Sequence, residues 1–186
     1  MPAGRRDPLK RLALGEALAA VGRNAAALHE YLWCFDRGAQ VDPAFAGVRL
    51  HPLLYAIAQL AEGYPPARRA LISRRDRLKR RLLRGRGRVM AAFDFCALNR
   101  YLCQEDTTVQ VCRELRRGTK VRVVLVDCAA RFLCGMRRYR ELLEIADPDD
   151  VFAFHLASIK SASSTECQLT IESCARVYWP RDAPLS

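Results

Sequence analysis

Cysteine and histidine are the residues of this sequence most capable of chemistry, because they bind zinc and can act together as a nucleophile and its base. The chain contains eight cysteines and three histidines. The cysteines form no C-x-x-C pair, and His29, His51 and His155 have no zinc-like spacing to them. We therefore predict no metal site and no cofactor, and we interpret the cysteines as reduced, packed thiols.

Other kinds of catalytic site have little support. Asp127 and Cys128 end a predicted strand and could meet His155 on another strand as a thiol site, but such residues more often pack in the core. Gly85-x-Gly87 lacks the third glycine of a dinucleotide-binding loop and follows a basic helix where a strand is needed. The sequence therefore predicts a protein that is not an enzyme.

Positive charge is concentrated in residues 68–88, here called the basic segment. The segment carries eleven basic residues and one acidic residue, Asp76, in a chain whose formal net charge is +11. Charge of one sign at this density costs self-repulsion in the folded state, which favours a role in binding anions. The candidate binding residues are Arg68, Arg69, Arg74, Arg75, Arg77, Lys79, Arg80, Arg81, Arg84, Arg86 and Arg88.

Four interpretations of the basic segment stay open. The residues RLKRR at Arg77–Arg81 fit a nuclear-import signal, and the charge density fits nucleic-acid binding. A basic amphipathic helix also fits an acidic protein or lipid surface, and the fourth interpretation is a solvated face without a partner. We predict an intracellular regulatory or interaction protein whose segment binds nucleic acid or a nuclear-import receptor.

Direct reading of base sequence has no support, because no zinc finger, RNP motif or recognisable helix-turn-helix accompanies the charge. Any nucleic-acid binding should therefore be salt-sensitive and weakly specific. Phe93, Phe95 and Tyr101 follow the segment and could stack on bases, but their helical spacing favours packing in the core.

Helical signals dominate the first two-thirds of the chain. Apolar residues at alternating spacings of four and three predict one helix over residues 8–35, with Leu14, Leu18, Val21, Ala25, Leu28, Leu32 and Phe35 on one face. Proline and glycine then bound a helix over 52–63 and another over 66–83. Further helices are predicted from Met90 to about Cys103 and from Asp106 to Gly118.

The pattern changes after residue 120. The β-branched run Val121–Val126 is typical of a buried strand, and a helix over 137–145 follows it. Residues 151–157 and 167–179 are predicted as two more strands joined by a polar loop. The last third of the chain is therefore expected to contain a small sheet.

These elements predict an α+β fold, with about five helices in the N-terminal two-thirds and a small, mainly antiparallel C-terminal sheet. A chain of 186 residues suits one domain over 1–186, with a helical part at 8–118 and a β-rich part at 119–180. Apolar stretches are too short to span a membrane, and Lys10, Arg11 and Glu16 interrupt any signal peptide. We predict a location in the nucleus and cytoplasm.

Short stretches between residues 25 and 121 resemble ankyrin repeats. LWCFDRGAQVD at Leu32–Asp42 is similar to the end of an ankyrin unit, and LHPLLYAIA at Leu50–Ala58 is similar to its opening. CRELRRGTKV at Cys112–Val121 and SRRDRL at Ser73–Leu78 extend the resemblance, at a period near forty instead of about 33. The resemblance implies a stack of helix pairs for protein recognition. The alternative function is therefore a protein–protein adaptor, for example a viral protein acting on a host partner.

Overall fold

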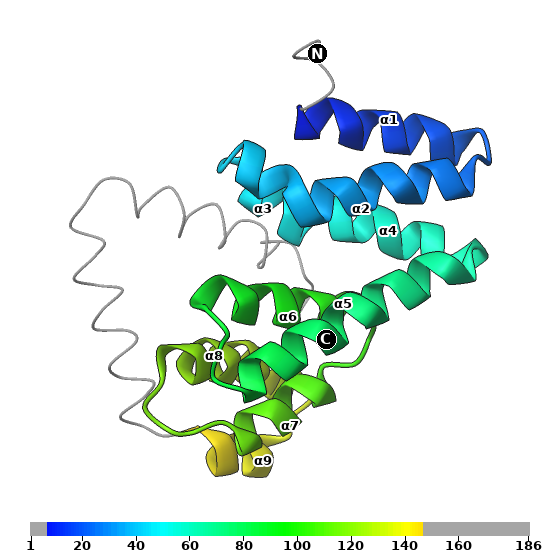
Figure 1. Ribbon diagram of the computed structural model, residues 1–186. Coiled ribbons are helices and arrows are strands. Elements are labelled where there is room, and N and C mark those ends of the chain that lie inside the picture. Colours follow the sequence, from blue (N-terminus) through cyan, green and yellow to red (C-terminus); the bar gives the residue numbers. More distant parts are fainter. Residues whose placement is uncertain (1–6, 147–186) are drawn as a thin grey trace. The chain divides into compact units, whose positions relative to one another are not determined.

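Nine α-helices make up residues 7–146, the part of the chain that the computed structural model describes (Figure 1). The chain divides into two units after Ile145, and all of these helices belong to the first. They are α1 (Pro8–Ala20), α2 (Asn24–Val41), α3 (Phe45–Leu50), α4 (Pro52–Gly63), α5 (Pro65–Leu83), α6 (Val89–Tyr101), α7 (Asp106–Glu114), α8 (Lys120–Gly135) and α9 (Tyr139–Ile145).

The α+β fold class predicted from the sequence is wrong, because residues 7–146 contain helices and no strand. The predicted β-rich part begins at residue 119, yet α8 and α9 lie between residues 120 and 145. The two further strands predicted at 151–157 and 167–179 lie outside the described residues. The predicted helices over 52–63, 66–83 and 137–145 are confirmed to within two residues.

Val121–Val126, predicted as a strand, lies in the first turns of α8. The side chain of Thr119 accepts a hydrogen bond from the first turn and so caps the helix. Leu125, Ala129 and Leu133 follow one another at spacings of four and are all buried. Strand propensity reflects how a side chain packs on a half-buried surface, so a helix that buries Val124 and Val126 overrides it.

The single helix predicted over 8–35 is two helices that reverse direction at Gly22. Gly22 has φ of +75°, and the amides of Gly22 and Arg23 donate to the carbonyls of Ala19 and Leu18, which ends α1. Val21, placed on the buried face by the prediction, is 70% exposed. Apolar spacing alone could not show the reversal, because the pattern continues in phase across the turn.

Helix α2 also extends beyond residue 35, the predicted end, to Val41. Gly38 is buried within α2, and a Cβ atom there would lie 2.5 Å from the ring of Phe45 on α3. The glycine is thus required for close packing and does not end the helix. Helix α3, which the sequence analysis did not predict, follows directly.

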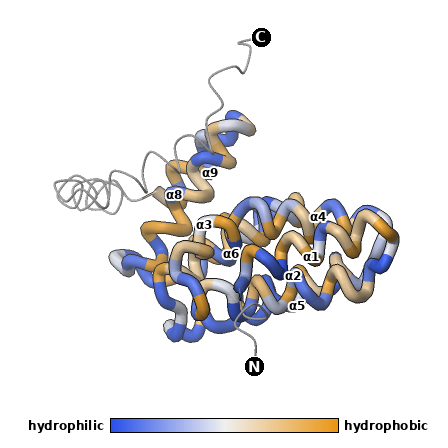
Figure 2. The backbone as a smooth tube through the Cα atoms, turned by 90° about the horizontal axis from the view of Figure 1, so that it is seen from above, coloured by the Kyte–Doolittle hydropathy of each residue, from blue (hydrophilic) through white to orange (hydrophobic). Residues whose placement is uncertain are grey.

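The helices pack largely in chain order. Helix α1 packs on α2, α2 on α4, α4 on α5 and α5 on α6, while α8 contacts α6, α7 and α9. Hydrophobic and hydrophilic residues alternate along the tube in Figure 2, as expected for helices buried on one side. None of the described helices is long and apolar enough to cross a membrane.

Helix α5 carries most of the basic segment and is fixed by its neighbours on both sides. Its buried residues Ala67, Leu71, Leu78 and Leu82 recur at spacings of four and seven and form one apolar face. This face packs against α4 and α6, with further contacts to α7. The opposite face of α5 is consequently left to its arginines.

Candidate anion-binding surface

The sequence of α5 favours a helix throughout. Pro65 and Pro66 occupy its first turn, where proline is tolerated, and Arg, Lys and Leu are good helix formers. At the other end, Gly85 has φ of +67°, and the amides of Gly85 and Arg86 donate to the carbonyls of Leu82 and Arg81. This Schellman arrangement turns the chain sharply after α5.

The structure divides the eleven candidate residues into two groups by exposure. Arg74, Arg75 and Lys79 are partly buried along the edges of the apolar face. The other eight are exposed, and they are Arg68, Arg69, Arg77, Arg80, Arg81, Arg84, Arg86 and Arg88.

Arg74 and Arg75 serve contacts within the protein. Arg74 pairs with Asp36 of α2 through two hydrogen bonds, of 3.0 Å from Nε and 2.5 Å from Nη2, and its side chain is only 14% exposed. Arg75 donates from Nε to Asp76 at 2.6 Å and from Nη1 to Gln104 at 2.5 Å. Their guanidinium groups are thus already occupied by protein acceptors, which leaves them little capacity for an external anion.

Arg77, Arg80, Arg81 and Arg84 form what we call the arginine stripe. Their positions follow the i, i+3, i+4, i+7 pattern, so they share one face of α5, pointing away from its buried face. Seven residues of helix place them along about 10 Å of the axis. Within the described residues, none of the four forms an ion pair with a carboxylate.

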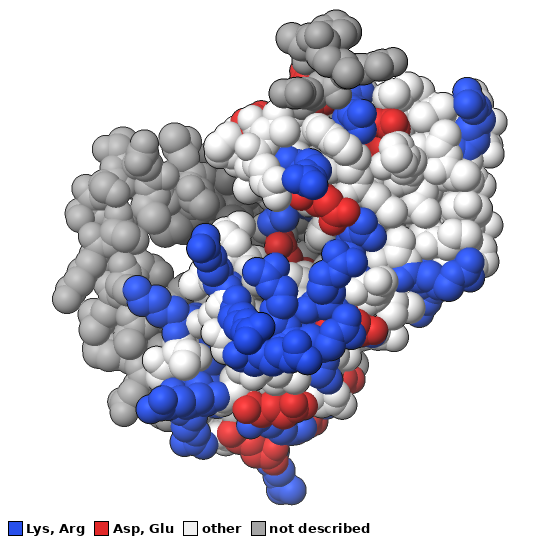
Figure 3. Space-filling model, viewed as in Figure 1, with Lys and Arg blue, Asp and Glu red and all other residues white. Residues whose placement is uncertain are grey.

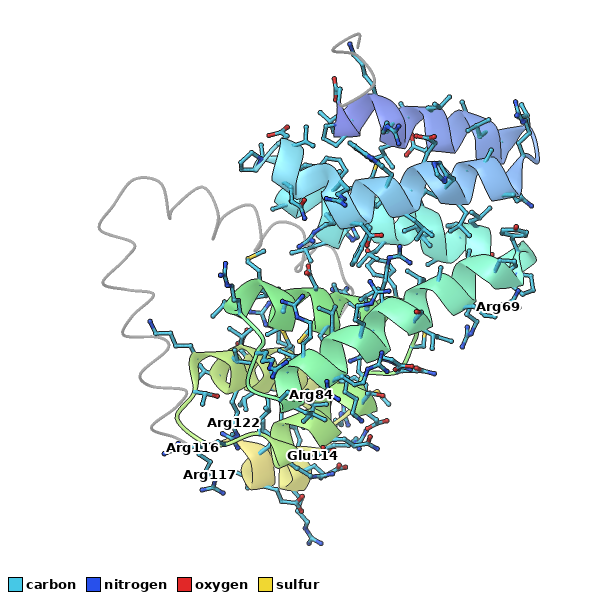
Figure 4. The ribbon with its side chains drawn as sticks, in the orientation of Figure 1. Arg69, Arg84, Glu114, Arg116, Arg117 and Arg122 are labelled. Carbon is cyan, nitrogen blue, oxygen red and sulfur yellow. The ribbon has the colours of Figure 1, made fainter. Side chains whose placement is uncertain are left out.

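The other exposed arginines fall at the two ends of α5. Arg86 and Arg88 lie in the turn that follows the stripe, whereas Arg68 and Arg69 lie at the start of the helix. Arg69 and Arg84 appear at opposite ends of α5 in Figure 4, about 22 Å apart along the axis at 1.5 Å per residue. Figure 3 shows basic side chains gathered over the C-terminal half of α5.

Repulsion among the stripe arginines and their attraction to the dipole of α5 are similar in size. Four like-charge pairs at i,i+3 or i,i+4 within the arginine stripe cost roughly 0.2–0.5 kcal/mol each. Arg80 and Arg81 lie in the last turn, where the helix dipole favours each cation by roughly 0.3–1 kcal/mol. A bound anion would remove the repulsion and keep the favourable dipole term, so the stripe is suited to bind one.

A polar cleft of about 450 Å³ lies between α5 and α7, and we call it the α5–α7 cleft. Asp76 and Lys79 line it from α5, and Arg75 hydrogen-bonds Gln104, another lining residue. The lining residues are Arg75, Asp76, Lys79, Cys103, Gln104, Asp106, Thr107 and Gln110. The sequence did not predict this cleft because its residues come from two distant stretches, 75–79 and 103–110, of ordinary polar composition.

No protein-family model, curated protein or solved structure matches this chain. The chemistry of the arginine stripe and of the α5–α7 cleft is therefore the basis for inferring its function.

The other candidates from the sequence are not assembled into a site. Asp127 and Cys128 lie on α8 instead of a strand, and His155 lies outside the described residues. Phe95 is fully buried, so it cannot stack on a base, and the ring of His51 hydrogen-bonds the hydroxyl of Tyr101. In the part of the chain that the structure describes, no group of three metal-binding side chains could hold an ion.

Proposed function

We propose that this chain binds nucleic acid through its phosphates, as a non-enzymatic regulatory or interaction protein of the nucleus and cytoplasm. The observation that carries the proposal is the arginine stripe, in which four exposed arginines share one face of a rigid helix. Arg86 and Arg88 continue the positive charge at the end of the same helix. Guanidinium groups pair well with phosphate oxygens, and a row of them suits a polyanion.

The helical state of the segment favours nucleic acid over an import receptor. A receptor that takes Arg77–Arg81 as an extended chain would have to unwind the end of α5. Leu78 and Leu82 are 9% and 1% exposed, so unwinding would expose both, at roughly 1.5–3 kcal/mol for each side chain. A phosphate backbone can instead contact the stripe while α5 stays folded.

A lipid surface fits the structure less well than nucleic acid. Helices that lie on membranes bury an apolar face in the lipid. The apolar face of α5 is already buried against α4 and α6, and the stripe face is made of arginines. We therefore do not propose a lipid surface as the partner.

The test measures binding of a generic RNA and a generic DNA duplex across a salt series. The variant replaces Arg77, Arg80, Arg81 and Arg84 together with glutamate. Each phosphate contact contributes about −0.9 to the slope of log K against log salt, so losing four should flatten the slope by roughly three to four. The wild-type protein should show the steep slope and the variant should bind weakly at every salt concentration.

The matched control changes the same amount of charge elsewhere. It replaces Lys10, Arg23, Arg116 and Arg140 with glutamate, all of which are exposed and lie outside α5. The control should keep most of the wild-type slope. If both variants lose the same amount of binding, overall charge and not the stripe accounts for the effect. If the wild-type protein fails to bind at low salt, the proposal is overturned.

A second candidate function is a protein–protein adaptor with an ankyrin-like stack. Packing of α1, α2, α4, α5 and α6 in chain order supports this candidate, because stacked helix pairs offer wide surfaces for protein recognition. The stretch at Leu50–Ala58 spans the start of α4 at Pro52, while Leu32–Asp42 lies almost wholly inside α2. An adaptor should keep its protein partner when the arginine stripe is reversed.

A further inference from the structure

The α5–α7 cleft lies directly beside the arginine stripe. Asp76 lines the cleft, and Arg80 follows four residues later, so the two are neighbours on the surface of α5. Lys79, also in the cleft, immediately precedes Arg80. A polymer that follows the stripe therefore passes the mouth of the cleft.

The charges inside the cleft make it a poor phosphate site. Asp76 is paired with Arg75 at 2.6 Å, and Asp106 is paired with Arg138 at 2.6 Å. Each carboxylate and its arginine partner cancel in charge, so these pairs offer a phosphate no net attraction. Lys79 adds a single positive charge to an otherwise balanced set.

The cleft does offer a mixture of hydrogen-bond donors and acceptors. Lys79 donates, Thr107 can do both, and the amides of Gln104 and Gln110 carry both kinds of group. Arg75 holds the Gln104 amide in place through its Oε1, which leaves the NH2 group of Gln104 to donate. A volume of about 450 Å³ is within the range of small-molecule sites, roughly 300–1,000 Å³.

We propose that the α5–α7 cleft holds one unpaired nucleobase, and that the preferred ligand is therefore single-stranded nucleic acid. This inference rests on the proposed function of the arginine stripe, which holds the phosphates on either side of that base. A base is uncharged and carries donors and acceptors on its edges, which can pair with the mixed polar groups of the cleft. In a duplex those edges are paired and stacked, and the base must be flipped out before its edge can reach the cleft.

The first test compares three probes of equal length: a single strand, its duplex, and an abasic single strand with the same phosphates. The single strand should bind roughly tenfold more tightly than the abasic strand, because only it can fill the cleft. Replacing Thr107 and Gln110 with alanine should remove most of that advantage and leave duplex binding and the salt slope unchanged. Ser73→Ala, an exposed polar truncation on α5 outside the cleft, is the matched control.

Cys103 gives a readout that is independent of affinity. It lines the cleft and is exposed, whereas Cys134 is exposed on α8 and is not part of the cleft. A saturating single strand should slow alkylation of Cys103 by iodoacetamide several-fold and leave Cys134 unchanged. The abasic strand at saturation should protect neither thiol.

The outcomes separate this inference from the proposed function. If single, abasic and duplex probes bind alike, with a slope that depends on the stripe and no protection of Cys103, the cleft proposal is overturned and the stripe proposal stands. If no probe binds at low salt, both are overturned. Protection of Cys103 that persists in the T107A/Q110A variant would also contradict a base held by these side chains.

Discussion

At the scale of single residues, the thiols divide into inert and available groups. Burial raises the pKa of Cys34 to about 11 and of Cys112 to about 12. Burial, together with a hydrogen bond to Cys128, also holds the pKa of Cys96 well above the usual value for a thiol. These thiols stay protonated near neutral pH and are poor nucleophiles. Among the cysteines of residues 7–146, Cys103 and Cys134 are exposed, so a reagent can reach their thiols.

The raised pKa values predict a loss of stability at alkaline pH. Below about pH 8.5 both states hold the proton, but above it the unfolded state releases protons that Cys34 and Cys112 keep until about pH 11 to 12. The free energy of unfolding should therefore fall as pH rises through this window, by up to about 1.4 kcal/mol per pH unit for each thiol.

Urea unfolding at pH 7, 9 and 10 measures this loss. A variant with Cys34 and Cys112 both replaced by alanine should be less stable at pH 7, because two buried side chains are truncated, but should show a shallower fall above pH 9. If stability falls equally in the wild type and the variant, other groups cause the alkaline loss. Tyr31 is one such group, because burial raises its pKa to about 12.

Residue-scale roles within the basic segment were only partly predictable. The sequence showed the charge density, but it gave Arg74 and Arg77 equal standing as ligands for an anion. Their difference depends on Asp36 in α2, which is 38 residues before Arg74. Such a partner cannot be identified from spacing along the chain, since it becomes adjacent only when α5 packs near α2.

At the scale of elements, short-range signals predicted helix ends well where proline or glycine acts locally. Pro52, Pro65 and Gly85 each mark a helix end in the structure. Prediction was wrong where packing between elements decides the outcome. Residues 121–126 are helical because Val124, Leu125 and Val126 are buried in the packed α8. Gly38 continues α2 because it packs against Phe45.

The turn after α5 yields a prediction about helix termination. Gly85→Ala should lower the free energy of unfolding by about 1–2 kcal/mol, since its φ of +67° is unfavourable for a residue with a Cβ. Nothing lies within 4 Å of the added methyl group, so the backbone alone accounts for the loss. Denaturant unfolding measures the difference.

Gly63 is the matched control for Gly85. It ends α4 without a positive φ, and its added Cβ would likewise meet nothing within 4 Å. Gly63→Ala should be neutral or slightly stabilising, because alanine loses less conformational entropy on folding. If both substitutions destabilise equally, the left-handed conformation of Gly85 is not the cause.

At the scale of the described unit, two of its ion pairs join residues that are 45 and 38 positions apart in the chain. Arg49 of α3 donates to Asp94 of α6 at 2.5 Å, with side chains 15% and 10% exposed. Burial raises the pKa of Asp94, and the Arg49 guanidinium opposes that rise. Arg74 joins α5 to Asp36 of α2, where the carboxylate is 42% exposed. The Arg49–Asp94 pair is thus the more deeply buried of the two.

This difference in burial predicts unequal effects of matched substitutions. Asp94→Asn should destabilise the protein by about 3–5 kcal/mol at neutral pH, because it leaves Arg49 buried without a counter-charge. Asp36→Asn removes a carboxylate that is 42% exposed, and Arg74, itself 14% exposed, keeps its hydrogen bond to the carbonyl of Ala70. This substitution should therefore cost about 0–1 kcal/mol. Replacing Arg49 with methionine and Asp94 with leucine together should cost less than Asp94→Asn alone. Equal effects of the two asparagine variants would contradict the burial argument.

For the proposed complex, the arrangement of the arginine stripe and the α5–α7 cleft also assigns their kinetic roles. The stripe's field extends about 8 Å at physiological salt, so it should orient an approaching polyanion and raise the association rate. Hydrogen bonds in the cleft form only after contact and should lengthen the lifetime of the complex. Added salt should therefore mainly slow association, whereas alanine at Thr107 and Gln110 should mainly speed dissociation.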